Sequence, residues 1–362
     1  MDRRKFVGAL AGCSLASAAP GLVPGLPGLL GGRAQADRKI DPNEKSPAEL
    51  ITPATQRAID RGLALLARRQ IKSGRMKGAM GTSGYSAGVA TCGLSGLAFM
   101  CGGNAPGEGK YGKQVNNCID YILNNVRDSG YIAVKDNRVH ENMYDHGFAM
   151  LFLSEVYGMT HKTEVGEKLR KAVALTCKCQ NNLGGWRYSP TKSDADLSIT
   201  VCQIMGLRAA RDAGITVPDE VRKKCIEYVQ KSQNGNGSFR YTMRGGHSTF
   251  AMTAAGVTSL YSAGIYEGDQ VTKALKYLMQ HKPSGSGFGG HYFYSNYYAV
   301  QAMWHAGGKY WNEWYPAIRD QLVKNQGSDG SWPSSEAGPE FGAAMACIIL
   351  QMPNNYLPVF SP

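Results

Sequence analysis

The sequence predicts an all-α protein, an α6/α6 toroid in which six helical hairpins form an inner and an outer ring. Two observations lead to this prediction. The first is a repeat of about 50 residues, a period typical of stacked helical units. The second is that each repeat holds one amphipathic helix and one helix that is apolar or small on almost every side. A helix that is apolar all round must be covered all round, so we expect a closed ring.

A glutamine or its equivalent near the end of one helix marks each repeat, and a glycine-aromatic turn follows it. The copies start at Gln70, Asn124, Gln180, Gln230, Gln280 and Gln326. The last four are the clearest, and they are separated by intervals of 50, 50 and 46 residues. Six units of this kind are enough to close a ring, and neither end of the series has the polar face of a capping repeat.

Each repeat is expected to begin with its amphipathic helix. These helices are predicted at residues 52–70, 111–126, 163–179, 217–231, 269–281 and 311–324. Glu164 and the run Pro218-Asp219-Glu220 are good start signals, because proline and acidic residues favour the first turn of a helix. The apolar helices are predicted at residues 87–101, 144–157, 196–213, 249–263, 296–306 and 341–351.

The chain divides into four parts. Residues 1–36 are predicted to be a twin-arginine export signal, 37–49 a flexible leader, 50–353 the single toroid domain and 354–362 a C-terminal tail. Arg3-Arg4 precede a short Gly- and Ala-rich apolar stretch, and Ala34-Gln35-Ala36 supply the small residues before a cut at Asp37. We therefore expect a periplasmic or cell-surface protein. The alternative is a lipoprotein anchored at Cys13.

Composition excludes several classes of partner and cofactor. The net charge is +12, but the basic residues are scattered rather than clustered, so no nucleic-acid partner is expected. No later segment approaches the roughly 18 apolar residues of a spanning helix. Most cysteines lie singly in apolar helical stretches, and Cys177 and Cys179 point in different directions on a helix. We therefore expect no transmembrane segment, no metal and no cofactor.

The turn motifs resemble a known superfamily. The run 180–186, Gln-Asn-Asn-Leu-Gly-Gly-Trp, and the later turns are similar to the repeats of squalene-hopene cyclases and protein prenyltransferases. The stretch 184–198 and the run from Tyr144 to Ala149 most resemble bacterial exported prenyltransferase/squalene-oxidase repeat proteins. The resemblance implies the α6/α6 toroid over nearly all of the mature chain. It does not specify a reaction.

One motif resembles the acid motif of class II terpene cyclases, Asp-x-Asp-Asp. Asp194-Ala195-Asp196 matches its first three positions, and the resemblance implies Asp196 as the proton donor with Asp194 beside it. Burial raises a carboxyl pKa, as such an acid requires. Leu197, however, stands where the family has a further Asp. The alternative is that Asp194 or Asp196 caps the third inner helix.

Two other activities of related toroids find little support. The resemblance to protein prenyltransferases implies a zinc site from Asp-x-Cys and a histidine of the next repeat. Here Ser198 replaces the cysteine, and His247 lies near the place of the histidine. Oxygen ligands of this kind suit zinc poorly. The Cys-Gly-Glu-Gln of complement-type thioester domains is absent from the sequence, which excludes that role.

Helix direction predicts where a site lies. The inner helices of a toroid all run the same way, so their N-termini, with unsatisfied N–H groups, gather at one rim. Besides Asp194 and Asp196, the predicted ligand-binding rim consists of Tyr85, Tyr144, Asp145, His146, His247, Tyr294, Asn296, Tyr297, Tyr298, Glu336 and Glu340. Each alone is also explained as a helix cap or a loop residue.

Three classes of function stay open on the sequence alone. The favoured one is a toroid that binds a hydrophobic or isoprenoid-like small molecule, or serves as a scaffold. The second is a class II terpene-cyclase-like enzyme that uses Asp196, although the acid motif is incomplete and the second toroid of triterpene cyclases is missing. The third is a carbohydrate-active α6/α6 barrel with paired carboxylates or a Tyr/His base at the same rim.

Overall fold

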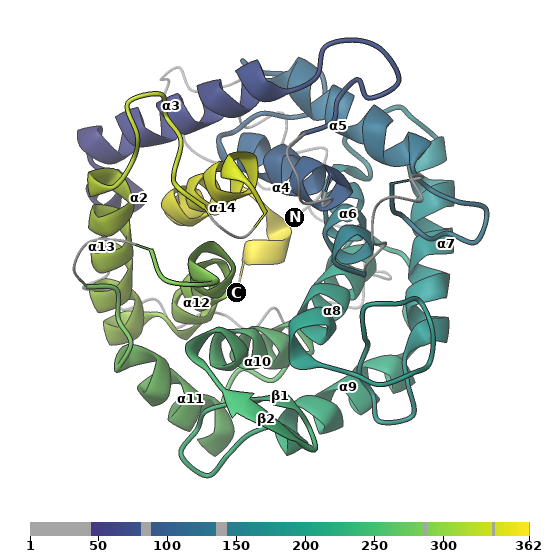
Figure 1. The fold of residues 1–362 in the computed structure, drawn as a ribbon, viewed down its shortest axis with the longest axis vertical. Coiled ribbons are helices and arrows are strands. Elements are labelled where there is room, and N and C mark those ends of the chain that lie inside the picture. The colour runs from purple at the N-terminus through teal and green to yellow at the C-terminus, as the bar shows by residue number, and fades with distance from the viewer. Residues whose placement is uncertain (1–44, 81–87, 135–142, 285–287, 335–336, 362) are drawn as a thin grey trace, which may run out of the picture.

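A computed structural model describes residues 45–80, 88–134, 143–284, 288–334 and 337–361 of the chain. Within them, two concentric rings of helices lie around one axis, and Figure 1 looks down that axis. The outer ring consists of α3 (Pro53–Arg69), α5 (Gly112–Asn124), α7 (Glu164–Cys179), α9 (Asp219–Lys231), α11 (Asp269–Met279) and α13 (Gly308–Lys324). The inner ring consists of α4 (Gly88–Cys101), α6 (Met143–Val156), α8 (Leu197–Asp212), α10 (Phe250–Ser262), α12 (Tyr292–Ala306) and α14 (Pro339–Gln351). The predicted α6/α6 toroid is confirmed.

The two rings differ in burial as the sequence pattern predicts. The outer helix α3 buries one face, which includes Ile59, Leu63 and Leu66, and exposes charged residues on the other. In the inner helix α8, every residue from Leu197 to Ala210 is buried. A helix with no solvent face is stable only between two layers of neighbours. The continuous apolar pattern therefore places these helices in the inner ring.

In the five repeat turns that the structure describes, a glycine packs against the backbone of the next outer helix. Gly184 has a φ of 99°, and a Cβ on it would lie 2.1 Å from the carbonyl oxygen of Lys224 in α9. Only glycine tolerates both the left-handed conformation and this close approach. The glycines that lie in the same way against the next outer helix are Gly78, Gly130, Gly237 and Gly330.

The glutamine of the turn connects the same two elements. Gln180 Nε2 donates to the carbonyl oxygen of Gly184, four residues on, at 2.9 Å, and to that of Val221 in α9 at 2.8 Å. Gln70, Gln233 and Gln326 each donate to their own turn and to the next outer helix. One amide group thus links the turn to the next outer helix through two hydrogen bonds.

The fourth repeat differs from the expected assignment. Gln233, and not Gln230, makes the bridging hydrogen bonds, because the carbonyl it must reach belongs to Gly237, four residues later. Gln230 contributes only its main-chain oxygen, which accepts from Gln270 Nε2 at 3.3 Å. The corresponding glycine after Gln280, Gly287, lies outside the described residues.

The last repeat closes the ring on the first with the same contacts. Gln326 Nε2 donates to the carbonyl oxygen of Ala58 in α3 at 2.9 Å. Gly330 packs on the carbonyl of Arg61, and a Cβ on Gly62 would lie 2.5 Å from Cys347 Sγ in α14. The first outer helix therefore contacts the last helix pair, and the ring is closed as predicted.

The described ends of the chain pack on the toroid. The short helix α2 (Pro47–Leu50) overlaps the end of the segment 37–49 that was expected to be a flexible leader. Arg319 Nη1 donates to the carbonyl of Leu50 at 3.0 Å. At the other end, η1 (Met352–Asn354) and η2 (Pro358–Phe360) turn into the centre of the ring (Figure 1). Phe360 is buried there, 6.2 Å from the ring of Tyr297. This segment covers the end of the toroid at which the inner helices terminate, because Arg208 Nη2 in α8 donates to the carbonyl of Ser361.

A two-stranded antiparallel hairpin, which the sequence pattern does not predict, stands between α9 and α10. Its strands are β1 (Arg240–Thr242) and β2 (Gly245–Ser248). It follows a glycine-aromatic turn, so it lies at the end of the toroid where the inner helices begin (Figure 1). The predicted export signal, including Cys13, lies outside the described residues. None of the described helices is both long and apolar enough to cross a membrane.

Candidate functional site

A cavity of about 810 Å³ opens at the end of the toroid where the inner helices begin. The first turns of all six inner helices contribute to its wall, through Ala90, Tyr144, Ser198, Ala251, Tyr294 and Phe341. The loop before α8 and the β1–β2 hairpin supply the remaining side. The parallel inner helices therefore place the cavity at the rim that their direction predicts, and helix N-termini surround it.

The wall of this cavity is mainly aromatic. Its rings are Tyr144, Phe148, Tyr188, Tyr241, Tyr294 and Phe341, with His247 and His291 as further lining residues. His291 begins α12 with a φ of 55°, a left-handed conformation that is uncommon for any residue other than glycine. No carboxylate side chain is among the described residues that line the cavity. The wall therefore suits an apolar ligand that carries few polar groups.

Asp196 lies directly behind this wall and is completely buried. It is the N-cap of α8: its Oδ1 accepts from the N–H of Ile199 at 2.9 Å and from Ser198 Oγ at 2.6 Å. Its Oδ2 lies 3.2 Å from Arg187 Nη1 and accepts from the hydroxyl of Tyr241 at 3.2 Å. Both carboxylate oxygens are thus engaged by donors of the protein itself.

These contacts act on the acidity of Asp196 in opposite directions. Burial raises the pKa of this carboxyl above its usual value, and the hydrogen bonds from Ser198 and Ile199 and the charge of Arg187 lower it. The donors stabilise the carboxylate, which accepts hydrogen bonds and donates none. A group that protonates a ligand must hold its proton where the ligand can reach it, and Asp196 does not line the cavity.

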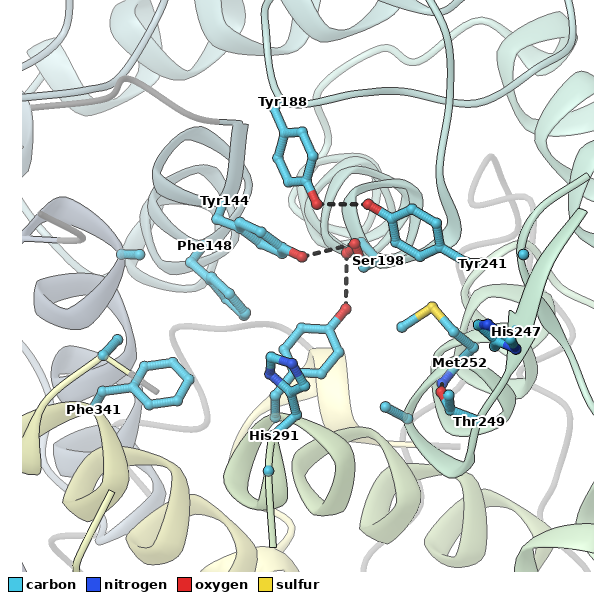
Figure 2. A pocket seen from close by; sticks show the side chains of 16 residues that line it. Tyr144, Phe148, Tyr188, Ser198, Tyr241, His247, Thr249, Met252, His291 and Phe341 are labelled. Atoms are coloured by element: carbon cyan, nitrogen blue, oxygen red, sulfur yellow. Dashed lines mark hydrogen bonds between the residues drawn. The ribbon is translucent and has the colours of Figure 1, made fainter. Parts of the chain in front are cut away.

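The tyrosines of the wall are tied to α8 and to one another (Figure 2). Tyr144 donates to Ser198 Oγ at 2.7 Å, and Tyr294 donates to the carbonyl oxygen of Ser198 at 2.9 Å. The hydroxyls of Tyr188 and Tyr241 are 2.6 Å apart. Burial raises the pKa of Tyr144 and of Tyr294 well above the usual range, so both hydroxyls keep their protons at neutral pH.

Two neighbours of Tyr144 that were predicted for the rim point away from the cavity. Asp145 Oδ1 accepts from the N–H of Ala90 at 2.8 Å, which ties α6 to the start of α4. His146 Nδ1 accepts from the N–H of Ile132 at 3.1 Å, and its Nε2 lies 2.8 Å from Thr176 Oγ1. Burial raises the pKa of Asp145 to about 7 and lowers that of His146 to about 4.

The role of His146 recurs in other repeats with a different residue. Thr200 Oγ1 accepts from the N–H of Trp186, and Thr253 Oγ1 accepts from the N–H of Phe239. In all three repeats, the accepting side chain stands 14 residues after the N–H that it receives. His146 is therefore a structural element of the repeat, which fixes the turn to the inner helix.

The other predicted site residues lie at several places. Tyr297 and Tyr298 are fully buried deeper in the ring, and Asn296 donates to the carbonyl of Tyr292 within α12. Asp194 is exposed, whereas Glu340 is buried in the first turn of α14. Of the predicted rim residues, Tyr144, His247 and Tyr294 line the cavity. Tyr85 and Glu336 lie outside the described residues.

Several lining residues were not predicted from the sequence, but two of them, Tyr188 and Tyr241, occupy the same position in their repeats. Tyr188 and Tyr241 each stand two residues after the aromatic residue of a turn, Trp186 and Phe239. Alignment of the repeats on their turns would have placed both tyrosines at the same rim. Phe148, Met252 and Phe341 resemble ordinary core residues in the sequence, and no comparable pattern identifies them.

Among the described residues, no group of three or more His, Cys, Asp or Glu could hold a metal ion.

Asp196→Asn is expected to lower the free energy of unfolding by about 2 to 4 kcal/mol, because the amide keeps the cap but places N–H donors against Arg187 or Tyr241. Urea denaturation of the purified protein measures this. Asp194→Asn is the matched control, since the same change on an exposed neighbour should leave the unfolding curve unchanged. Equal stability of the two variants would show that the buried contacts of Asp196 contribute little.

The raised pKa of Asp145 predicts a pH dependence of stability. An unfolded Asp loses its proton near pH 4, whereas folded Asp145 keeps it until about pH 7. Ionisation therefore favours the unfolded state, and the free energy of unfolding should fall as the pH rises from about 4 to about 7. Asp145→Asn cannot ionise, so its free energy of unfolding should not fall in this way. The difference in the free energy of unfolding between the variant and wild type should therefore rise by up to about 4 kcal/mol in favour of the variant from about pH 4 to about pH 7. Urea denaturation at a series of pH values tests this, and parallel curves would contradict it.

Comparisons with known proteins agree with this architecture. Residues 136–295 match the prenyltransferase alpha-alpha toroid domain. The type II terpene cyclase MstE from Scytonema is 12% identical, with a TM-score of 0.58 over 84% of this chain and 100% of that one. Cellobiose 2-epimerase from Bacillus thermoamylovorans is 12% identical, with a TM-score of 0.61 over 83% of this chain and 99% of that one.

A third solved structure, the GH76 alpha-mannanase from Bacteroides thetaiotaomicron, is 11% identical, with a TM-score of 0.60 over 86% of this chain and 98% of that one. No curated protein matches the sequence. At these identities the structural likeness defines the fold and leaves the reaction open. The match over residues 136–295 and the closed double ring agree with the predicted resemblance to the prenyltransferase and terpene cyclase toroids.

Proposed function

We propose that this protein binds a hydrophobic, isoprenoid-like small molecule in the rim cavity. The observation that supports this proposal is an aromatic cavity of about 810 Å³ whose nearest acid, Asp196, is closed off behind its wall. Ligand sites of small molecules have volumes of roughly 300 to 1,000 Å³ and mainly apolar walls. Both the volume and the lining of the cavity fit this description.

The binding role is favoured over proton-initiated cyclisation. A solved structure of an MstE variant is a complex with the substrate geranylgeranyl dihydroxybenzoate, so a protein of this fold can bind an isoprenoid compound. An acid that protonates an alkene must carry a proton and face the ligand. Here the donors around Asp196 stabilise its carboxylate, and Leu197 replaces the adjoining acid of the cyclase motif.

The carbohydrate-active role receives less support from the cavity. Glycoside hydrolysis uses two carboxyl groups at the scissile bond, and none of the described lining residues is acidic. His247 and His291 do line the cavity, but a sugar ring also requires many polar partners. The surrounding wall instead offers rings such as Phe148 and Phe341, which suit an apolar chain.

Export through the twin-arginine route is part of the same proposal and rests on residues 1–36 of the sequence. If the signal is used as proposed, N-terminal sequencing of protein recovered from the exported fraction should begin at Asp37. A mature chain that starts at a lipid-modified Cys13 would replace this with an anchored protein. An unprocessed Met1 in the producing cell would contradict export.

Filling the cavity should abolish ligand binding. Ala251 lies in the first turn of α10 and is half-buried against the cavity, so Ala251→Phe would place a ring inside it. We expect the affinity for a neutral apolar dye such as Nile red, measured by fluorescence titration, to fall by at least about ten-fold. Ala54→Phe, on the exposed face of α3, is the matched control and should bind like wild type. Unchanged binding in Ala251→Phe would locate the dye elsewhere and contradict the proposal.

A further inference from the structure

The charge of Asp196 determines which hydroxyl donates in each hydrogen bond behind the cavity wall. Asp196 as a carboxylate can only accept, so the hydroxyls of Ser198 and Tyr241 must donate to it. Because the proton of Tyr241 is used on Asp196, the 2.6 Å contact with Tyr188 requires Tyr188 to donate. On the other side, Tyr144 donates to Ser198 Oγ at 2.7 Å.

The fourth tyrosine of the wall follows the same rule. Tyr294 donates to the carbonyl oxygen of Ser198, in the first turn of α8. Tyr144 and Tyr294 thus direct their hydroxyl protons toward the start of α8, Ser198 and Tyr241 direct theirs toward Asp196, and Tyr188 directs its proton toward Tyr241. Figure 2 shows the contact of Tyr144 with Ser198 and that of Tyr188 with Tyr241. These groups present oxygen lone pairs and ring faces to a ligand. The tyrosine side of the cavity is therefore a surface of acceptors.

We infer that the cavity selects a neutral hydrophobic molecule that carries a hydroxyl group, in preference to the same molecule with an anionic head such as a phosphate. This inference rests on the proposed ligand binding and defines the polar end of the ligand. A hydroxyl can donate to the tyrosine oxygens and can also accept from the imidazoles of His247 and His291, the other polar rings of the wall.

Charged head groups fit this wall less well. An anion leaves water at a large cost unless donors replace its hydration. Because the hydroxyl protons of the wall are already used, the imidazoles of His247 and His291 are the donors that the described polar rings can offer it. Arg187 does not supply them, because it pairs with Asp196 and its guanidinium lies 5.1 and 5.4 Å from the ring centres of Tyr188 and Tyr241. A cationic head group could lie over the aromatic ring faces, but no carboxylate lines the described wall to pair with it. The nearby carboxylate, Asp196, already pairs with Arg187.

A matched series of C15 probes tests the inference on the full mature chain. Farnesol donates and accepts, farnesyl methyl ether only accepts, and farnesyl phosphate is an anion. In competition with Nile red, we expect farnesol to bind about three- to ten-fold more tightly than the ether, the effect of one neutral hydrogen bond. Farnesyl phosphate should bind at least about ten-fold more weakly than farnesol, because two imidazole donors replace only part of the hydration that its charge loses.

Tyr241→Phe tests the direction of the hydrogen bonds. Without the Tyr241 oxygen, Tyr188 loses the partner to which it donates and can turn its proton toward the ligand. The Tyr188 hydroxyl can then donate to the oxygen of the ether, which binds more tightly. The dissociation constant of the ether divided by that of farnesol should therefore fall toward one. Tyr266→Phe is the matched control: this ring stacks on Tyr261 after the C-terminal end of α10, away from the cavity, and its loss of a hydroxyl should leave the ratio unchanged.

The outcomes separate this inference from the function on which it rests. If the alcohol and the ether bind equally and Ala251→Phe abolishes both, ligand binding in the cavity stands and the acceptor surface is refuted. Tightest binding of farnesyl phosphate, or an unchanged ratio in Tyr241→Phe, also overturns the inference. If none of the three probes competes with Nile red, the inference fails together with the isoprenoid-like ligand.

Discussion

The contact between each turn glycine and the carbonyl of the next outer helix is the constraint on which the rest of the structure depends. Gly184 packs against the carbonyl of Lys224 in the next repeat, and Gly330 packs in the same way against the carbonyl of Arg61, where the last repeat meets the first. At four of the junctions a turn glutamine adds two hydrogen bonds, as Gln180 does. Because these junctions fix the direction of every hairpin, all inner helices begin at one end, and a cavity surrounded by helix N-termini follows from ring closure itself.

The same repeat also determines which rim residues are available to a ligand. Polar side chains at the start of an inner helix are needed to satisfy N–H groups, and Asp196 and Thr249 both do so as N-caps. His146 holds the backbone of its turn in the way that Thr200 holds that of the next one. The side chains that face the cavity are therefore mostly aromatic. The composition of the wall is thus a consequence of how the repeats are joined.

The fold and the position of the site could be predicted from the sequence, because both depend on a period and on helix direction, which a single chain displays. The identity of the lining residues could not. Successive helical residues point about 100° apart, so Tyr144 faces the cavity while Asp145 turns to α4 and His146 to the preceding turn. That choice depends on where the neighbouring helices stand. The hairpin β1–β2 and the buried Phe360 likewise depend on contacts that no local pattern encodes.

Solved structures of this fold include a terpene cyclase, a mannanase and a sugar epimerase, so the side chains at the rim must decide the chemistry. In this chain, Asp196 occupies the place that the cyclase resemblance gives to an acid. Its buried oxygens receive a helix N–H, a serine, a tyrosine and an arginine, and they orient the hydroxyl protons of the wall. Under the proposed function, a carboxylate at this position acts through the tyrosines it orders. One residue then links the stability of α8 to the polarity that a ligand meets.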